Sequence, residues 1–507
     1  MTDANPLLQP WDTPYGLPPF ASVQPQFFEP AFEVAMREQR TELDAIAADS
    51  QPPTFENTLA TFDRSGRRLS RIGALFHNLC SSNTSPELQA VQRRMAVPIA
   101  AHESAIYMHE GLFKRVDALN EQRQKLALAP EQLRLLERVH LDFVRAGALL
   151  RGEAKERYKQ VLERLAELTT AFAQNVLHDE STWKLVLRDE ADLAGLPESV
   201  RSAARTAAAE RGVADAYVIT LSRSSIVPFL TLSERRDLRE QAWRAWVTRG
   251  EREGEHDNRP LVGQILALRK EQAQLHGYSS FADYALVDRM ARKPAAVMEL
   301  LDNVWERAKP VVERERAQLQ AAQRAAGQEG DIHAWDWRYW AEKVRQREYA
   351  VDDADVKPYF PLEAMVDAAM DCAQRLFDIR FTPRPDLPSY HPDVKTYEVH
   401  HANGDLVGLF VHDNFARPTK RSGAWMSTLR RQTRNGEAMR PIVLNNNNFA
   451  KGSPTLLSFD DVRTLFHEFG HGLHGLLSDV TYLKLSCTGV LRDFVELPSQ
   501  LFEHWMA

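Results

Sequence analysis

Residues 458–476 constrain the fold of this chain more than any other segment, because they carry His-Glu-x-x-His within an apolar run. Residues four apart lie on one face of a helix, so His467 and His471 can direct two imidazoles at one metal ion only if this segment is helical. Ser458 and Asp461 have the spacing of a capping box at a helix start. The apolar residues that follow keep helical spacing: Val462, Leu465, Phe466, Phe469, Leu473 and Leu476. The segment therefore predicts a helix that carries the motif.

Three glycines lie in the same predicted helix, at Gly470, Gly472 and Gly475. Each costs up to about 1 kcal/mol relative to alanine in a helix interior. A helix that keeps three of them at such a cost indicates that space is needed on its surface. We therefore expect another backbone to pack very closely against this helix.

The motif has the residue types of a catalytic zinc site. Two imidazoles one helical turn apart can bind one zinc ion, and Glu468 lies one step round the helix, where it can act as a general base toward a metal-bound water. We assign His467 and His471 as ligands of one zinc ion per chain and Glu468 as the catalytic base. The alternative for the two histidines is a pair of hydrogen-bonded core residues.

A catalytic zinc site needs a third protein ligand and one open position. The candidate is Glu496, in the segment Arg-Asp-Phe-Val-Glu-Leu-Pro-Ser-Gln at residues 492–500. A loop with Gly489 precedes it and is long enough for a second helix to turn back against the first. Taken alone, Glu496 would be a carboxylate favoured by a helix N-terminus. Beside the motif, we predict that it is the third ligand.

Other side chains near the motif are expected to support the site rather than bind metal. Glu503 lies seven residues after Glu496 on the same helix face, and we hypothesise that it orients a zinc-binding imidazole. His474 is expected to pack against the ligands or support them, because a fourth protein ligand would close the site. Cys487 is expected to be a structural thiol. The histidines expected to be surface or structural residues are His400, His401 and His412.

Residues 467–474 and 493–500, with the patterns His-Glu-Phe-Gly-His-x-x-His and Asp-Phe-Val-Glu-x-Pro-Ser-Gln, resemble the thimet oligopeptidase family of zinc metallopeptidases. Further segments are most similar to the bacterial peptidyl-dipeptidases of that family: residues 5–8, 15–16, 53–58, 335–339, 357–360 and 420–426. The resemblance implies a mainly α, two-lobed protein whose zinc site lies deep in a channel that admits short peptides. It also implies release of C-terminal dipeptides, with an endo-acting oligopeptidase of the same family as the alternative.

The family continues beyond the Glu-x-Pro-Ser-Gln helix. The resemblance implies that this later segment carries a histidine and a Gly/Tyr-rich loop whose tyrosines stabilise the oxyanion and bind substrate. The sequence ends at Ala507 and holds no such loop earlier, so we expect a catalytic region truncated at its C-terminus. Loss of one oxyanion donor typically lowers a rate by about 10²–10³. A zinc-binding but inactive truncated form therefore stays open, as does a helical scaffold with a fortuitous motif.

Composition excludes several other classes of protein. The 507 residues are 44% hydrophobic, enough for several large cores, and 26% charged with a net charge of −7. The sequence has no basic patch for nucleic acid and no apolar run of about 18 residues for a membrane span. Residues 1–6 have neither a basic nor an apolar region, so we expect no signal peptide. Its three cysteines are far apart, which fits a reducing compartment. We expect a cytoplasmic monomer that acts on short peptides.

Helical spacing of apolar residues runs through most of the chain and is clearest at residues 154–177. We divide the chain into an N-terminal helical region, residues 1–270, and a catalytic region, residues 271–507. The sequence thus predicts a mainly α protein.

The period changes from 3.6 to 2 shortly before the motif. Residues 397–401 alternate, Asn403-Gly404 is a strong signal for a two-residue hairpin turn, and residues 406–411 form the returning strand. Residues 441–444 predict a further strand, which the asparagines at 445–448 would end. We therefore expect a small antiparallel sheet directly before the metal helix.

An edge strand of this sheet would be able to hold an extended peptide by backbone pairing. Gly423 and Ala424 would let a peptide backbone approach closely. A plain loop at these two residues is the alternative.

Overall fold

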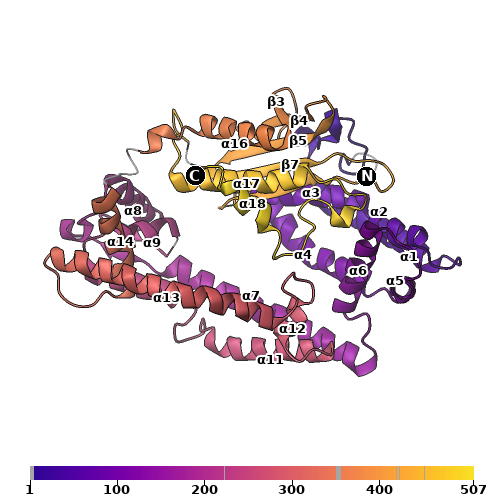
Figure 1. Cartoon of the computed structure of the whole chain (residues 1–507), viewed down its shortest axis with the longest axis horizontal. Coiled ribbons are helices and arrows are strands. Elements are labelled where there is room, and N and C mark those ends of the chain that lie inside the picture. The colour runs from indigo at the N-terminus through magenta and orange to yellow at the C-terminus, as the bar shows by residue number, and fades with distance from the viewer. Residues whose placement is uncertain are drawn as a thin grey trace. The chain divides into compact units, whose positions relative to one another are not determined.

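The computed structural model describes residues 5–221, 223–349, 356–417, 419–421, 423–449 and 451–506. The chain divides into two compact units, one formed by Met1–Leu149 with Asp353–Ala507 and the other by Leu150–Asp352 (Figure 1). The first unit thus joins the two ends of the sequence. The boundary expected at residue 270 falls inside helix α11 (Arg259–Leu275), so the grouping by contacts differs from the division made from the sequence.

Within the described residues, the second unit consists of helices and one two-stranded sheet. Its long helices are α7 (Gly152–Thr182) and α13 (Pro294–Ala325), and β1 (Leu185–Leu187) pairs antiparallel with β2 (Tyr217–Ile219). The other elements are η5 (Glu190–Leu193), α8 (Glu198–Glu210), α9 (Arg223–Leu232), α10 (Arg236–Val247), α11, α12 (Phe281–Leu286) and α14 (Ala334–Tyr349). The stripe predicted in α7 buries Tyr158, Val161 and Leu168. None of the helices in the described ranges is both long and apolar enough to cross a membrane.

The N-terminal part of the first unit is helical after a few short 3-10 turns. Its elements are η1 (Pro14–Gly16), η2 (Phe20–Ser22), η3 (Pro25–Phe27), α1 (Phe28–Ala48), η4 (Phe55–Ala60), α2 (Thr61–Arg64), α3 (Arg67–Ser82), α4 (Pro86–Tyr107), α5 (Glu110–Glu121) and α6 (Pro130–Arg145). One core forms around Phe28, Phe32 and Phe76, and a second around Phe113 and Phe143. The prediction of a mainly α protein is confirmed.

A five-stranded sheet in the first unit precedes the helix with the motif. Its elements are η6 (Lys357–Tyr359), α16 (Leu362–Phe377), β3 (Ile379–Pro383), β4 (Lys395–His401), β5 (Leu406–Phe415), β6 (Trp425–Arg430) and β7 (Ile442–Phe449), with the strands in the spatial order β3-β4-β5-β7-β6. β4 and β5 pair antiparallel, and Gly404 in the turn between them has φ +88°. The predicted hairpin is therefore present.

Two predictions about this sheet are wrong. First, the sheet is mixed: β3–β4, β4–β5 and β6–β7 pair antiparallel as predicted. β5 and β7 run parallel, because the chain passes from β5 to the edge strand β6 and returns between them. Alternation of apolar and polar residues shows which side chains share a face of a strand, but it does not show which neighbour the strand pairs with. Second, the asparagines do not end the strand, since Asn445, Asn446 and Asn447 lie inside β7 and are fully buried.

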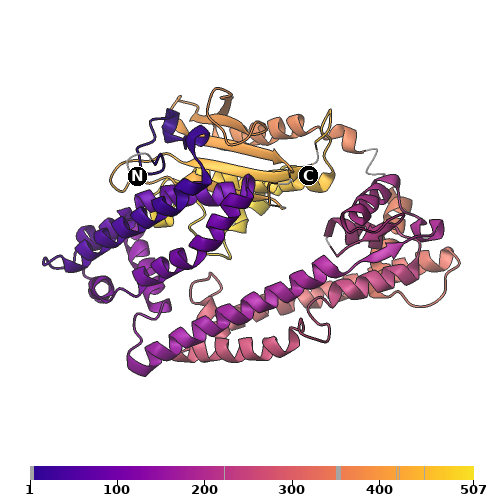
Figure 2. The same ribbon diagram turned by 180° about the vertical axis from the view of Figure 1, so that it is seen from behind.

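These asparagines are buried because both faces of the sheet are covered. Asn445 contacts helix α17 (Phe459–Leu476) at Gly472, while Asn446 faces the other way and accepts a hydrogen bond from Ser82 Oγ at the end of α3. Figure 2 shows the N-terminal helices in front of the strands, on the side opposite α17.

The motif lies on α17, which packs against the sheet and against the short helix α18 (Glu496–Glu503) (Figure 1). The predicted capping box is present: Ser458 Oγ accepts the Asp461 N–H, and the Asp461 carboxylate accepts the Ser458 N–H. A Cβ added at Gly470 would lie 2.8 Å from Pro498 O and Ser499 Cα of α18. The close approach of a second backbone is therefore confirmed at Gly470, whereas the other two glycines of the helix lie against side chains of the sheet.

Candidate active site

Three side chains predicted as metal ligands come together at the contact between α17 and α18. His467 and His471 project from successive turns of α17, and Glu496 is the first residue of α18. Glu496 Oε2 lies 3.3 Å from His467 Nε2 and 3.1 Å from His471 Nε2. One ligand atom from each residue lies within 4.8 Å of the other two. The arrangement brings two imidazole nitrogens and one carboxylate oxygen to a single point.

Local packing explains why Glu496 reaches this point. Gly470 lies between the two histidines, and its missing side chain lets the backbone of α18 approach α17. Phe466 stacks on Phe502 at a ring-centroid distance of 5.6 Å, which fixes the other end of the short helix. The first residue of α18 therefore faces the histidine pair.

The donor set fits a zinc ion. Zinc prefers imidazole nitrogen and carboxylate oxygen, and catalytic sites use three protein ligands with a fourth position open. Burial lowers the pKa of His471, so the neutral form that can bind metal is favoured. Within the described residues, the buried His471 Nδ1 and Glu468 Oε2 have no hydrogen-bond partner.

Glu503 contacts one of the predicted ligands, as the sequence suggested. Its Oε1 lies 2.7 Å from His467 Nδ1. An ionised carboxylate only accepts hydrogen bonds, so the proton of this imidazole belongs on Nδ1. Nε2 then presents its lone pair toward Glu496 and the metal position.

Glu468 is placed where a base would act. Its side chain is 6% exposed, and it follows His467 directly on the buried side of α17. Burial raises the pKa of the Glu468 carboxyl to about 7, opposed by His467 and reinforced by the nearby Glu496 charge. A carboxyl group with a pKa near neutrality can both accept and return a proton at physiological pH.

The remaining candidates lie outside the ligand cluster. His474 packs edge-on against the ring of Phe494 at 6.4 Å, and the buried thiol of Cys487 contacts the carbonyl oxygen of Gly475. His400 and His401 lie on β4, and His412 is buried in β5. No histidine among these three joins the described metal cluster.

The sheet offers an edge near these residues. β6 is a terminal strand of the sheet, and it also packs against α17. Gly423, just before β6, has φ +91° with open space where a side chain would begin. Whether a peptide pairs with this strand stays a prediction.

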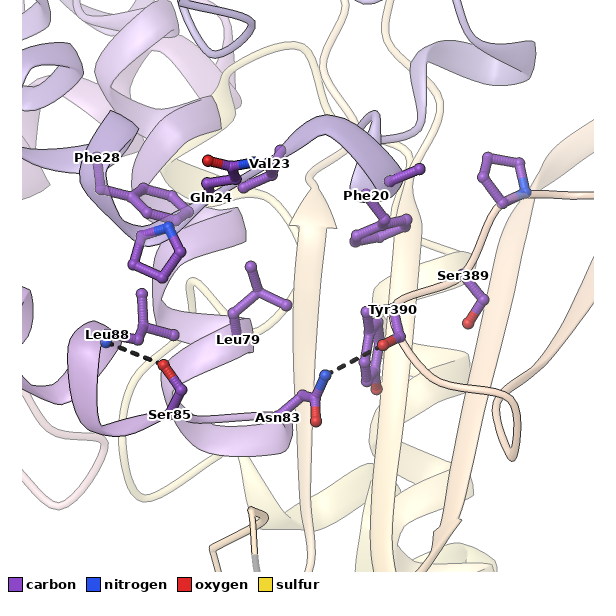
Figure 3. Close-up of a pocket in the computed structure, with 13 residues that line it drawn as sticks. Phe20, Val23, Gln24, Phe28, Leu79, Asn83, Ser85, Leu88, Ser389 and Tyr390 are labelled. Atoms are coloured by element: carbon purple, nitrogen blue, oxygen red, sulfur yellow. Dashed lines mark hydrogen bonds between the residues drawn. The ribbon is translucent and has the colours of Figure 1, made fainter.

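A pocket of about 510 Å³ lies elsewhere in the first unit (Figure 3). Its lining consists of Phe20, Ala21, Val23, Gln24, Pro25, Phe28, Leu79, Asn83, Ser85, Leu88, Pro388, Ser389 and Tyr390. This lining has no carboxylate and no imidazole, and none of the predicted site residues belongs to it. It therefore does not compete with the cluster on α17 as a site of acid–base chemistry.

The chain is similar in sequence to known proteins that are named as peptidases. The sequence model of Peptidase family M3 matches residues 229–507. The chain is 38% identical to the dipeptidyl carboxypeptidase of Salmonella typhimurium, over 99% of this chain and 74% of that protein. It is 37% identical to the dipeptidyl carboxypeptidase of Escherichia coli, over 100% of this chain and 75% of the relative. Oligopeptidase A of Escherichia coli is 35% identical, over 99% of this chain and 74% of that relative. The similarity thus extends through both compact units.

Proposed function

The chain belongs to Peptidase family M3 and is a metallopeptidase, and from that premise we propose that it uses one zinc ion to hydrolyse short peptides, releasing dipeptides from their C-termini. The observation that carries the zinc assignment is the convergence of His467 Nε2, His471 Nε2 and Glu496 Oε2. The dipeptide product is suggested by the names of the relatives from Salmonella typhimurium and Escherichia coli.

The residues of the site divide the chemistry among them. His467, His471 and Glu496 would hold the zinc ion, which when bound would acidify a water molecule and polarise the peptide carbonyl. Glu468 takes the proton from the attacking water and later delivers it to the leaving amine. Glu503 keeps the proton of His467 on Nδ1 and so holds that imidazole in the ligand tautomer. Burial of Glu468 keeps its carboxyl poised between the two protonation states.

The second candidate is an endo-acting oligopeptidase. It is favoured by the identity of 35% to oligopeptidase A, which is only slightly below the identity to the dipeptidyl carboxypeptidases. We further propose a two-lobed enzyme that works in the cytoplasm as a monomer. A zinc-binding but inactive form of the 507-residue chain remains the third alternative.

A product assay distinguishes these alternatives. One zinc-loaded sample receives a pentapeptide with a free C-terminus, and a second sample receives the same peptide amidated at its C-terminus. The products of both are identified by mass spectrometry. We expect stepwise loss of dipeptides from the free peptide, little cleavage of the amidated one, and no cleavage by Glu468→Gln. Equal cleavage of both peptides would favour the oligopeptidase, and no cleavage with zinc bound would favour the inactive form.

A further inference from the structure

The connector between α17 and α18, residues 477–495, determines where the third ligand begins. It contains the 3-10 turn η7 (Leu483–Leu485). Four consecutive backbone N–H groups at its centre donate hydrogen bonds to two carboxylates. These bonds are Thr481 N–H to Glu131 Oε1 (2.6 Å), Tyr482 N–H to Glu131 Oε1 (3.1 Å), Leu483 N–H to Asp63 Oδ2 (2.9 Å) and Lys484 N–H to Asp63 Oδ1 (2.9 Å).

Both carboxylates come from the N-terminal helices of the same unit. Asp63 lies on α2, and Glu131 lies in the first turn of α6. Asp63 also accepts a hydrogen bond from Asn435 Nδ2 at 2.9 Å, and Arg64 donates to Asn435 Oδ1 at 2.6 Å. The Asp63 carboxylate is therefore held by a partner outside the connector, and Glu131 is held through its place in the first turn of α6.

Neighbouring side chains add further contacts between the connector and the rest of the unit. Tyr482 is buried in the core of the N-terminal helices, with its ring 5.4 Å from that of Phe55. Gln432 exchanges two hydrogen bonds with the backbone of Val480. The connector is thus fixed at its middle, and only residues 485–495 separate the fixed part from Glu496.

Fixing the connector bears on the metal site because α18 is short. A helix of eight residues is not stable on its own, so its position depends on what it packs against and on how it is attached. Hydrogen bonds from backbone N–H groups to a charged carboxylate are stronger than neutral ones. An attachment point that is already ordered also lowers the conformational entropy that is lost when Glu496 takes its place beside the two histidines.

We propose that Asp63 and Glu131 are positioning residues of the metal site: by binding the backbone of residues 481–484 they fix the connector that places Glu496 beside His467 and His471. The proposal rests on the zinc site of the proposed function. It assigns a role in metal binding to two acids that lie more than 300 residues before the ligands.

The geometry of the two acids predicts different responses to amide substitution. Glu131 receives both N–H groups on one oxygen, so Glu131→Gln can keep both bonds with its amide oxygen. Asp63 uses one oxygen for each N–H, so Asp63→Asn must turn an NH₂ group toward one of them. Glu131→Ala removes both bonds and leaves Asp63 unchanged. Asp142 is a matched control, because it pairs with the Lys484 side chain and not with the connector backbone.

Zinc affinity, measured on the whole chain by competition with a chelator, tests the proposal. We expect affinity to fall about tenfold in Asp63→Asn and in Glu131→Ala, as for other groups that orient ligands. Glu131→Gln and Asp142→Asn should stay within about threefold of the unsubstituted chain, by the same scale. Hydrogen exchange of residues 485–496 should speed up in the first two variants only.

The outcomes separate this proposal from the zinc site itself. If the unsubstituted chain binds no zinc, the proposed function is wrong. If it binds zinc and the folded Glu131→Ala protein binds it equally tightly, the positioning role is overturned. Should Asp63→Asn fail to fold, the pair Glu131→Ala and Glu131→Gln still decides, because loss in one and recovery in the other supports the role.

Discussion

The contact between Gly470 and α18 predicts a sharp response to one added methyl group. In Gly470→Ala, the new Cβ would lie 2.8 Å from Pro498 O and Ser499 Cα and 2.9 Å from Phe502 Cβ. Two of these atoms belong to backbone, which cannot rotate away. Ordinary van der Waals contact begins near 3.4 Å, so α18 must move by about 0.6 Å. Metal ligands tolerate about 0.2 Å. We therefore expect Glu496 to move out of range.

The stability change follows from two opposing terms. Overpacking costs about 1–3 kcal/mol, while replacing a helical glycine with alanine returns up to about 1 kcal/mol. We expect the free energy of unfolding of Gly470→Ala to be lower by up to about 2 kcal/mol and its zinc affinity to be at least about tenfold weaker. Gly263 in α11 is the matched control, because a Cβ there meets nothing within 4 Å. Gly263→Ala should stabilise the protein.

Urea unfolding and zinc competition on the two variants check this reasoning. The expected pattern is a loss of both stability and affinity in Gly470→Ala and a small gain of stability alone in Gly263→Ala. Equal behaviour of the two variants would show that α18 is not held tightly against α17, and the explanation for this glycine would be refuted.

Two further predictions concern single side chains. Glu503→Gln should weaken zinc binding about tenfold, because the carboxylate no longer fixes the tautomer of His467; unchanged affinity in a competition assay would contradict that role. Burial lowers the pKa of His412 to about 3, whereas the ordinary value in an unfolded chain is near 6.5. Between pH 3 and pH 6.5 the unfolded state therefore binds one more proton than the folded state. The stability that is present above pH 6.5 is lost as the pH falls below that value. At pH 5 this costs about 2 kcal/mol. Urea unfolding measures the free energy of unfolding at pH 7 and at pH 5. Between these values the unsubstituted chain should lose about 2 kcal/mol more than His412→Gln. Equal losses in the two proteins would exclude His412 as the cause.

Local sequence signals were sufficient for the helix that carries the site. The Ser458 and Asp461 capping box, the apolar spacing and the histidine pair all act within a few residues of one another, so no knowledge of the rest of the fold was needed. The glycines also signalled a close neighbour, and Gly470 has one in α18. What the glycines did not reveal is that the neighbours of the other two are side chains of the sheet.

The sheet was less predictable because its arrangement depends on distant segments. β7 lies between β5 and the edge strand β6, and its sequence pattern would be the same if the strands followed one another in chain order, so the parallel pairing of β5 and β7 was missed. The buried asparagines are explained only when the helix on one face and Ser82 on the other are known.

The attachment of the connector had no local signal at all. Asp63 and Glu131 are ordinary helix carboxylates in the sequence, and their partners lie about 350 to 420 residues later. These contacts lie within the compact unit that combines the two ends of the chain.

The most direct test of the account is the zinc content of the 507-residue chain by native mass spectrometry, measured beside Glu496→Ala and Glu468→Gln. The account predicts one zinc ion per chain, retained in Glu468→Gln because that carboxylate is a base and not a ligand, and lost in Glu496→Ala because the site then has only two histidines. Absence of zinc from the unsubstituted chain, or one tightly held zinc ion in Glu496→Ala, would contradict it.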